Sequence, residues 1–546
     1  MGRYSWLFVV CGLFAWASSV SGGSSDHQHE EVIQTPLGIA EGVVNGSAVR
    51  FSVKYASAER WKESEVVSTW SLPNGFTDAT KMPLACPQDT LDASAYSEDC
   101  LSMVLYVPSD LLVSGCGDAP TFMWTHGGSF TEGFASDYGL DGSIFAVATN
   151  SIVAVVQYRL GALGFMAPDG NTNLAVKDMI NAMKFLQTIV PSFGGHPSKI
   201  TLAGQSSGAM MIRTLLAAPS ASSLFQSAII QSDPMNYGFL NVSTQETLQS
   251  FYNQLIVCDS ADSSCWDSLS IDEILEAQSI LYNNASAIDA SASFVIPIRP
   301  VRDNVLITTP LDSTAKYPPV TKPILITSVL DEAAATIYDL FPDVVPQTSF
   351  DAVVSGLLGV DRTTTVASSG YYQSNASDAR HLLVKLGTDY VWRCPDWTMA
   401  RNWASNGGAV YVGLFTVGAH YYSNANIPFC QEDGAVCHSD DIEIVVGFSL
   451  AGVLFHRSDF DTCLQFGTVS NPDQAQTNLI SQVQQRYKSF LCAGHPNPPG
   501  LPKWSAAGKS KVHAYDLGSC GRVKAGACRP AFWGSAVEYD YQVYGL

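Results

Sequence analysis

A serine between two glycines is the strongest candidate nucleophile in this sequence. Ser206 lies in Gly204-Gln-Ser-Ser-Gly208, after the apolar run 199–203 and before the helix-forming run 209–216. A strand, turn and helix in this order hold a serine in a tight turn, where a side chain at either glycine would crowd the backbone. The five-residue pattern alone is weak, and the flanking elements carry the prediction that Ser206 attacks an acyl group.

A serine hydroxyl needs a base that accepts its proton. Of the ten histidines, His438 fits best, because it lies in a loop directly before the apolar stretch 442–448. The others with a clear context lie in the N-terminal segment or in turn motifs, namely His27, His29, His126 and His196. The alternative for His438 is a structural histidine.

The carboxylate that orients this base should follow a strand. The apolar run 323–329 ends in Leu330-Asp331-Glu332, which gives the chain order serine, acid, histidine expected for this chemistry on a parallel sheet. The sequence therefore predicts Ser206, His438 and an acid from the Asp331-Glu332 pair as the catalytic residues.

Backbone N–H groups must stabilise the oxyanion that forms during such a reaction. The apolar strand pattern 122–125 runs into His126-Gly-Gly-Ser-Phe130, whose glycines let the main chain approach a substrate carbonyl. We expect the N–H groups of Gly128, Ser129 and Ser207 to form the oxyanion hole. A structural turn is the alternative for this loop.

Short β-branched runs alternate with helical patterns and predict an α/β fold, a large mixed but mostly parallel sheet flanked by helices. The apolar spacing in 177–190 predicts a helix on the sheet, and 240–292 and 341–380 resemble helical insertions. The strands are expected at 121–125, 152–158, 200–203, 228–231, 324–329 and 409–415. Without repeats or long linkers, residues 23–546 form a single catalytic domain.

Residues 1–22 have the pattern of a secretory signal peptide, with a basic start, an apolar run and small residues at the end. Twelve of the 13 cysteines follow this segment, an even number that fits disulfides in an oxidising compartment. We expect a secreted protein without a stable membrane anchor. Four sequons predict glycosylation at Asn45, Asn241, Asn284 and Asn375. The net charge of −21 argues against nucleic-acid partners.

Several motifs in fixed order resemble the type-B carboxylesterase/cholinesterase family of α/β hydrolases, over most of residues 32–535. Besides the serine turn and the His126–Phe130 loop, they are 97–101 (SEDCL), 158–165 (YRLGALGF), 193–197 (FGGHP), 231–232 (QS), 331–332 (DE) and 437–438 (CH). The resemblance implies the α/β-hydrolase fold. It also implies that Glu332, and only as a distant second Asp331, is the acid of the triad.

The resemblance further implies a structural ion pair and three disulfides. Arg60 and Glu98 match the family's ion pair. The implied disulfides are Cys86–Cys100, Cys258–Cys265 and Cys394–Cys528. The pairing of Cys116, Cys430, Cys437, Cys463, Cys492 and Cys520 is left open.

Departures from the family pattern bear on the substrate. Gln205 replaces an acidic residue, Ser207 an alanine and Ser129 a glycine, and none of these changes removes a backbone N–H. The loop 87–99 contains no tryptophan, and it is short. This argues against choline esters and against a lid formed by this loop. The substrate pocket is expected at Gln205, Met235, Tyr237 and Phe239, although these aromatic residues would equally fit a core.

The expected reaction is two-step hydrolysis of a small-molecule ester, soluble or of short to medium chain, without a cofactor or metal. The alternatives are a triacylglycerol lipase or sterol esterase and, from another class, a non-catalytic adhesion or binding protein. The natural ester and the oligomeric state are left open.

Overall fold

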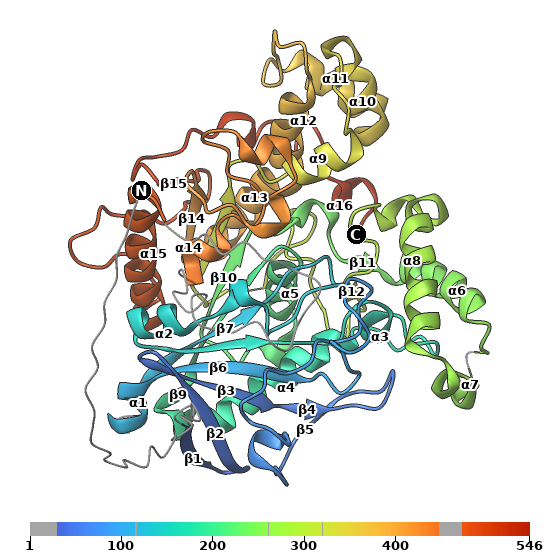
Figure 1. Cartoon of the computed structure of the whole chain (residues 1–546). Helices are drawn as coiled ribbons and strands as arrows, with labels where there is room; N and C mark the ends of the chain where they lie inside the picture. Colours follow the sequence, from blue (N-terminus) through green and yellow to red (C-terminus); the bar gives the residue numbers. More distant parts are fainter. Residues whose placement is uncertain (1–29, 115–116, 260, 319, 447–471) are drawn as a thin grey trace, which may run out of the picture.

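The computed structural model describes residues 30–114, 117–259, 261–318, 320–446 and 472–546 (Figure 1). The expected signal segment 1–22, Cys116 and Cys463 lie outside the described residues.

Eleven of the described strands form one sheet in the order β1-β2-β3-β6-β8-β7-β9-β10-β13-β14-β15. From β8 to β15 all neighbouring strands are parallel, whereas β1, β2, β3 and β6 pair in antiparallel fashion and β6 joins β8 in antiparallel fashion. The strands are β1 (Glu30–Thr35), β2 (Gly38–Asn45), β3 (Ala48–Lys54), β6 (Ser102–Pro108), β7 (Ala119–Thr125), β8 (Ile152–Val156), β9 (Gly195–Gln205), β10 (Ser227–Gln231), β13 (Ile324–Val329), β14 (Val410–Phe415) and β15 (Tyr515–Leu517). Short pairs are formed by β4 (Ala56–Ser57) with β5 (Glu65–Val66) and by β11 (Leu240–Asn241) with β12 (Val301–Arg302).

The central strands are apolar on both faces because helices cover both sides of the sheet. On β7, Phe122 and Trp124 point into one hydrophobic core, and Met123 points into the other. Each of the six expected strands is present, and only the one expected at 152–158 ends earlier, at Val156. The antiparallel strands β1 to β3 were not among the expected ones.

One face of the sheet packs against α4, α5 and α13, and the opposite face against α2, α14 and α15. The helix expected at 177–190 is α4, which begins three residues earlier. Among the described residues, no helix has both the length and the apolar character required to cross a bilayer. The helices are α1 (Ser109–Ser114), α2 (Ser143–Thr149), α3 (Gly161–Phe165), α4 (Leu174–Ile189), α5 (Ser207–Leu216), α6 (Val242–Ile256), α7 (Ser263–Ser268), α8 (Ile271–Ile288), α9 (Ala334–Leu340), α10 (Phe350–Leu358), α11 (Val360–Ser368), α12 (Arg380–Gly387), α13 (Cys394–Ser405), α14 (Ile442–Val446), α15 (Gln474–Ala493) and α16 (Asp540–Val543).

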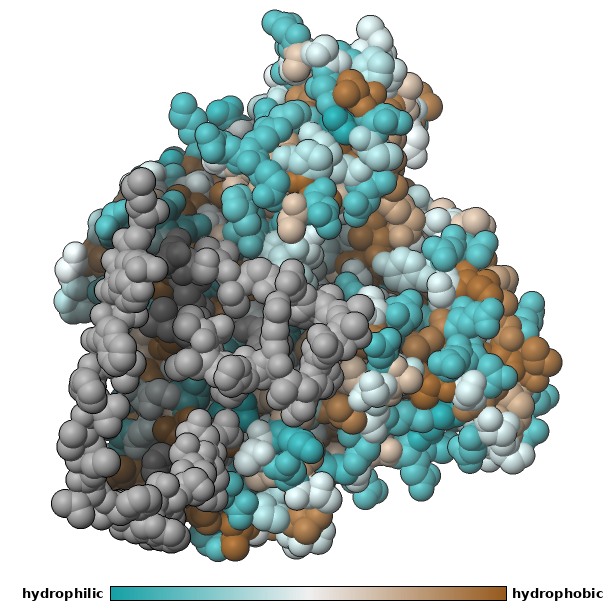
Figure 2. Space-filling model, in the orientation of Figure 1, coloured by the Kyte–Doolittle hydropathy of each residue, from teal (hydrophilic) through white to brown (hydrophobic). Residues whose placement is uncertain are grey.

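Two groups of helices project from the sheet at the places where insertions were expected (Figure 1). The first contains α6, α7 and α8, and the second contains α10 and α11. Val360, the first residue of α11, is exposed. In Figure 2 the lobe at the top carries both hydrophilic and hydrophobic residues on its surface. Scattered apolar side chains are normal for a protein surface.

Four disulfides join described cysteines. Three are those implied by the family resemblance, Cys86–Cys100, Cys258–Cys265 and Cys394–Cys528. The fourth is Cys430–Cys437, whose pairing the sequence left open. Cys492 and Cys520 are exposed and form no disulfide with any cysteine in the described ranges. The expected ion pair also forms, with Arg60 Nη2 2.5 Å from Glu98 Oε1.

Candidate active site

Ser206 lies in the turn between β9 and α5, at the carboxyl edge of the parallel strands. Its φ of 58° and ψ of −126° are a strained combination for a residue with a side chain. The two glycines around it permit this turn. A Cβ on Gly204 would lie 2.6 Å from the backbone of Gly208, and one on Gly208 would lie 2.3 Å from the carbonyl oxygen of Thr125. The turn therefore requires glycine at both positions.

Glu332 and His438 meet although 106 residues separate them. Nδ1 of His438 donates to Oε2 of Glu332 at 2.5 Å, and Oε1 of Glu332 accepts from the N–H of Val329 at 2.8 Å. Glu332 is buried at the end of β13. Burial disfavours the imidazolium, but the hydrogen bond and charge of Glu332 outweigh it, and the pKa of His438 rises above its ordinary value.

The neighbouring carboxylate, that of Asp331, contacts the backbone of Val436. Oδ2 of Asp331 accepts from the N–H of Val436 at 3.2 Å, and the N–H of Asp331 donates to the carbonyl of Val436 at 2.9 Å. Burial raises the pKa of Asp331 to about 6. Asp331 thus attaches the histidine loop to the end of β13, and Glu332 holds the ring.

The loop that carries His438 is held on several sides. The Cys430–Cys437 disulfide ends one residue before the histidine. Asn424 Nδ2 donates to the carbonyl of His438 at 2.8 Å and to Asp440 Oδ1 at 2.8 Å. The N–H of Cys437 donates to Oδ2 of Asp440 at 2.7 Å. The sequence analysis did not single out Asn424 or Asp440. The only signal available was that Asp440 lies two residues after the histidine.

The other nitrogen of His438 faces the serine turn. Nε2 of Gln205 lies 3.2 Å from Nε2 of His438 and also 3.2 Å from the hydroxyl of Ser439. Because an amide nitrogen only donates, this contact makes Nε2 of His438 an acceptor and leaves its proton on Nδ1, toward Glu332. That tautomer is the one a general base requires. Among the described hydrogen bonds, Nε2 pairs with Gln205 and not with Ser206; such contacts often tighten only when substrate binds.

A carboxylate at position 205 is expected to shift the pH profile of ester hydrolysis. The base works only when it is neutral, so activity falls as the pH drops below the pKa of His438. Glu332, Asp440 and Asp441 already favour its protonated form. In Gln205→Glu, a further negative charge about 3 Å away is expected to raise the midpoint of this fall in kcat/KM by roughly one pH unit.

The profile is measured with p-nitrophenyl acetate between pH 5 and 9. Gln226→Glu is the matched control, since Gln226 contacts the carbonyl of Leu491 and lies away from the site. An unchanged midpoint in Gln205→Glu would mean that the side chain at 205 does not face His438 in solution.

The candidate oxyanion loop lies directly on the serine turn. A Cβ on Gly208 would be 2.6 Å from the carbonyl oxygen of His126. Gly128, Ser129 and Phe130 have φ values of 105°, 53° and 63°. In the part of the chain that the structure describes, no hydrogen bond uses the N–H groups of Gly128 or Ser129. Free N–H groups next to a serine turn are what an oxyanion hole requires.

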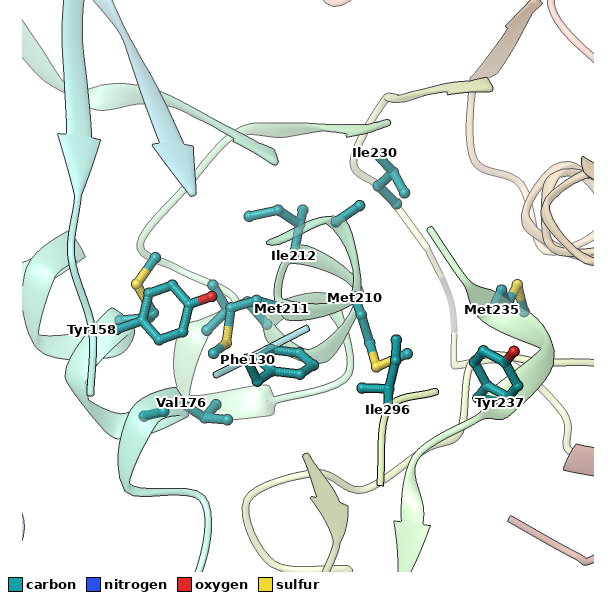
Figure 3. Packing of buried hydrophobic residues seen from close by; sticks show 14 of the residues in the cluster. Phe130, Tyr158, Val176, Met210, Met211, Ile212, Ile230, Met235, Tyr237 and Ile296 are labelled. Atoms are coloured by element: carbon teal, nitrogen blue, oxygen red, sulfur yellow. The ribbon is translucent and has the colours of Figure 1, made fainter. Parts of the chain in front are cut away.

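The residues expected in the substrate pocket are buried. Met235, Tyr237 and Phe239 belong to the main hydrophobic core, and Figure 3 shows Met235 and Tyr237 together at one side of it. The guanidinium of Arg213 lies 4.4 Å from the ring centre of Phe239. Their part in an acyl pocket stays a prediction. A residue that the sequence analysis missed is Trp392, whose ring centre lies 5.5 Å from that of His438.

The four sequon asparagines differ in accessibility. Asn284 and Asn375 are exposed, whereas Asn45 and Asn241 are half-buried. Nδ2 of Asn45 donates to Asp141, and Oδ1 of Asn241 caps α6 by accepting from the N–H of Thr244. Glycosylation at all four stays a prediction.

Within the described residues, one group of side chains has a spacing that suits a metal ion. It consists of Asp389, Cys394 and Cys528. The two sulfur atoms are joined in a disulfide, so they offer no thiolate ligand.

Comparison with known proteins identifies the family of this chain. The model of the carboxylesterase family matches residues 29–533. The chain belongs to that family. The sequence of this family member is 26% identical to that of the crystal protein of Dictyostelium discoideum, over 81% of this chain and 78% of that protein. It is 25% identical to pyrethroid hydrolase Ces2e of Rattus norvegicus, over 82% of this chain and 77% of the relative.

A solved structure shows the same fold. A PNB esterase aligns with a TM-score of 0.71 at 23% identity, covering 89% of this chain and 96% of that chain. At this identity the likeness shows the fold alone. The carboxylesterase-family chain therefore has the α/β-hydrolase fold that the sequence resemblance implied.

Proposed function

We propose that this chain is a secreted serine carboxylesterase that hydrolyses soluble esters of short or medium chain length. The observation that carries the proposal is the pairing of His438 with Glu332, which leaves Nε2 of His438 facing the serine turn. This arrangement supports Ser206 as nucleophile, His438 as base and Glu332 as the orienting acid.

The proposed reaction has two steps. His438 takes the proton of Ser206 as the hydroxyl attacks the ester carbonyl, and the same proton goes to the leaving alcohol. Water then attacks the acyl-enzyme while His438 takes its proton. The bond between the acyl carbon and the Ser206 oxygen breaks, the carboxylic acid leaves, and His438 returns the proton to Ser206. The N–H groups of Gly128, Ser129 and Ser207 stabilise the oxyanion in both steps.

Secretion is part of the proposal. Four disulfides among the described cysteines support folding in an oxidising compartment, because thiols stay reduced in most cytosolic proteins.

A series of p-nitrophenyl esters from acetate to palmitate tests the activity and its preference. We expect kcat/KM for acetate or butyrate to exceed that for palmitate by about tenfold or more, a discrimination that pocket contacts commonly supply. The short disulfide loop at 86–100 is the reason, because it offers no extended lid over the site.

Each other outcome selects a different function. A preference for palmitate that grows at a lipid–water interface would favour the lipase or sterol esterase alternative. Purified, folded protein that hydrolyses none of the esters would favour the non-catalytic binding protein.

A further inference from the structure

Two hydrogen bonds to buried side-chain hydroxyl groups hold the two ends of the candidate oxyanion loop. The N–H of Phe130 donates to the hydroxyl oxygen of Ser207 at 3.3 Å. At the other end of the loop, the hydroxyl of Tyr158 donates to the carbonyl of His126 at 3.2 Å. Two of the donors proposed for the oxyanion hole, Gly128 and Ser129, lie between His126 and Phe130 in the sequence.

Both hydrogen bonds are enclosed in the core. Phe130, Tyr158 and Ser207 have an exposed fraction of 0%, and His126 has 4%. In the view of Figure 3, Tyr158 and Phe130 lie beside Met211, on the helix that follows the serine turn. The ring of His126 stacks on that of Tyr158 at 4.8 Å. Without competing water, each of these hydrogen bonds holds its partner more firmly than it would at the surface.

The oxyanion loop needs such support. Ser129 and Phe130 adopt positive φ although neither is glycine, a conformation that persists only where the surroundings enforce it. The N–H of Gly161 donates to the carbonyl of Phe130 at 2.7 Å, so the far end of the loop is held as well. The hydroxyl of Ser207, the residue directly after the nucleophile, links this loop to the start of α5.

We propose that the Ser207 hydroxyl is a positioning residue for the oxyanion hole. By accepting from the N–H of Phe130, it fixes the distance between the Ser206 oxygen and the N–H groups of Gly128 and Ser129. The inference rests on the proposed esterase function. It goes beyond that function because the family pattern has alanine at this position, so this part of the support comes from a residue particular to this chain.

The test replaces Ser207 with alanine, which keeps the backbone N–H and removes only the hydroxyl. We expect kcat for p-nitrophenyl acetate to fall by roughly 10- to 100-fold, the effect of a small misplacement of catalytic groups, with KM changed by less than about twofold. The inhibition constant of a trifluoromethyl ketone, which forms a tetrahedral adduct with a serine, is expected to rise by the same factor as kcat falls.

Two further variants separate positioning from simple loss of packing. Tyr158→Phe removes the hydrogen bond at the other end of the same loop. The double variant is expected to lose little more than either single one, because releasing one end already displaces the loop. Ser227→Ala is the matched control. Ser227 is also buried and hydrogen-bonded to a hydroxyl, that of Thr201 at 2.8 Å, but it lies inside the sheet. It is expected to keep the wild-type kcat.

The outcomes distinguish this inference from the proposed function. A wild-type protein without esterase activity would overturn both. An active wild type, with Ser207→Ala unchanged in kcat and in ketone affinity, would overturn the positioning role alone. The same holds if kcat and thermal stability fall together while ketone affinity is unchanged.

Discussion

Ser206→Ala is expected to lower kcat for p-nitrophenyl acetate by on the order of a millionfold. Without the hydroxyl no acyl-enzyme forms, and the remaining rate comes from the oxyanion donors and from substrate binding alone. The fold should be unaffected. Alanine also carries a Cβ, so the strain at φ 58° is the same as in the wild type.

The measurement combines turnover, thermal stability and labelling by a fluorophosphonate, which reacts covalently with an activated serine. The wild type and Ser227→Ala should both be labelled and active, whereas Ser206→Ala should be neither and should melt at the wild-type temperature. Equal rates in Ser206→Ala and the wild type would reject Ser206 as the nucleophile.

Glu332→Gln is expected to lower kcat by about 10⁴-fold, the loss typical when an orienting acid becomes its amide. Oε1 of Glu332 accepts from the N–H of Val329, so the glutamine oxygen is held on that side. Its NH₂ group then faces Nδ1 of His438. The imidazole must carry its proton on Nε2 instead, where it cannot accept the proton of Ser206.

The adjacent carboxylate provides the control for this prediction. Asp331→Asn keeps an oxygen that can accept from the N–H of Val436 and does not touch the ring of His438. It should therefore cost far less in kcat than Glu332→Gln. Steady-state kinetics of both variants decide the assignment. A larger loss in Asp331→Asn would identify Asp331 as the orienting acid and refute the assignment to Glu332.

The sequence predicted the features that depend on neighbours along the chain. Strands such as 121–125 and 324–329 are readable because burial on both faces demands continuous apolar residues. The serine turn can be predicted because its backbone segments approach too closely for a side chain at 204 or 208. Only glycine fits there, and the two glycines are visible in the sequence. The antiparallel strands β1 and β2 were harder to predict, since their partly exposed residues follow a weaker pattern.

Only the tertiary structure shows which contacts the neighbouring side chains of Asp331 and Glu332 make. Sequence spacing alone does not distinguish Asp331 from Glu332, and the choice rested on family resemblance until the fold placed one against Val436 and the other against His438. The Cys430–Cys437 disulfide was likewise undetermined, because cysteine pairing depends on distances in space.

Residue types along the chain thus determined the kind of chemistry and the elements that carry it, because local backbone and burial requirements restrict which residues fit. Tertiary structure decided the contacts within the site. Gln205 meets His438 across 233 residues, and Ser207 joins Phe130 across 77. Such hydrogen bonds form only when separate strands and loops converge at one edge of the sheet, and no local pattern in the sequence records their partners.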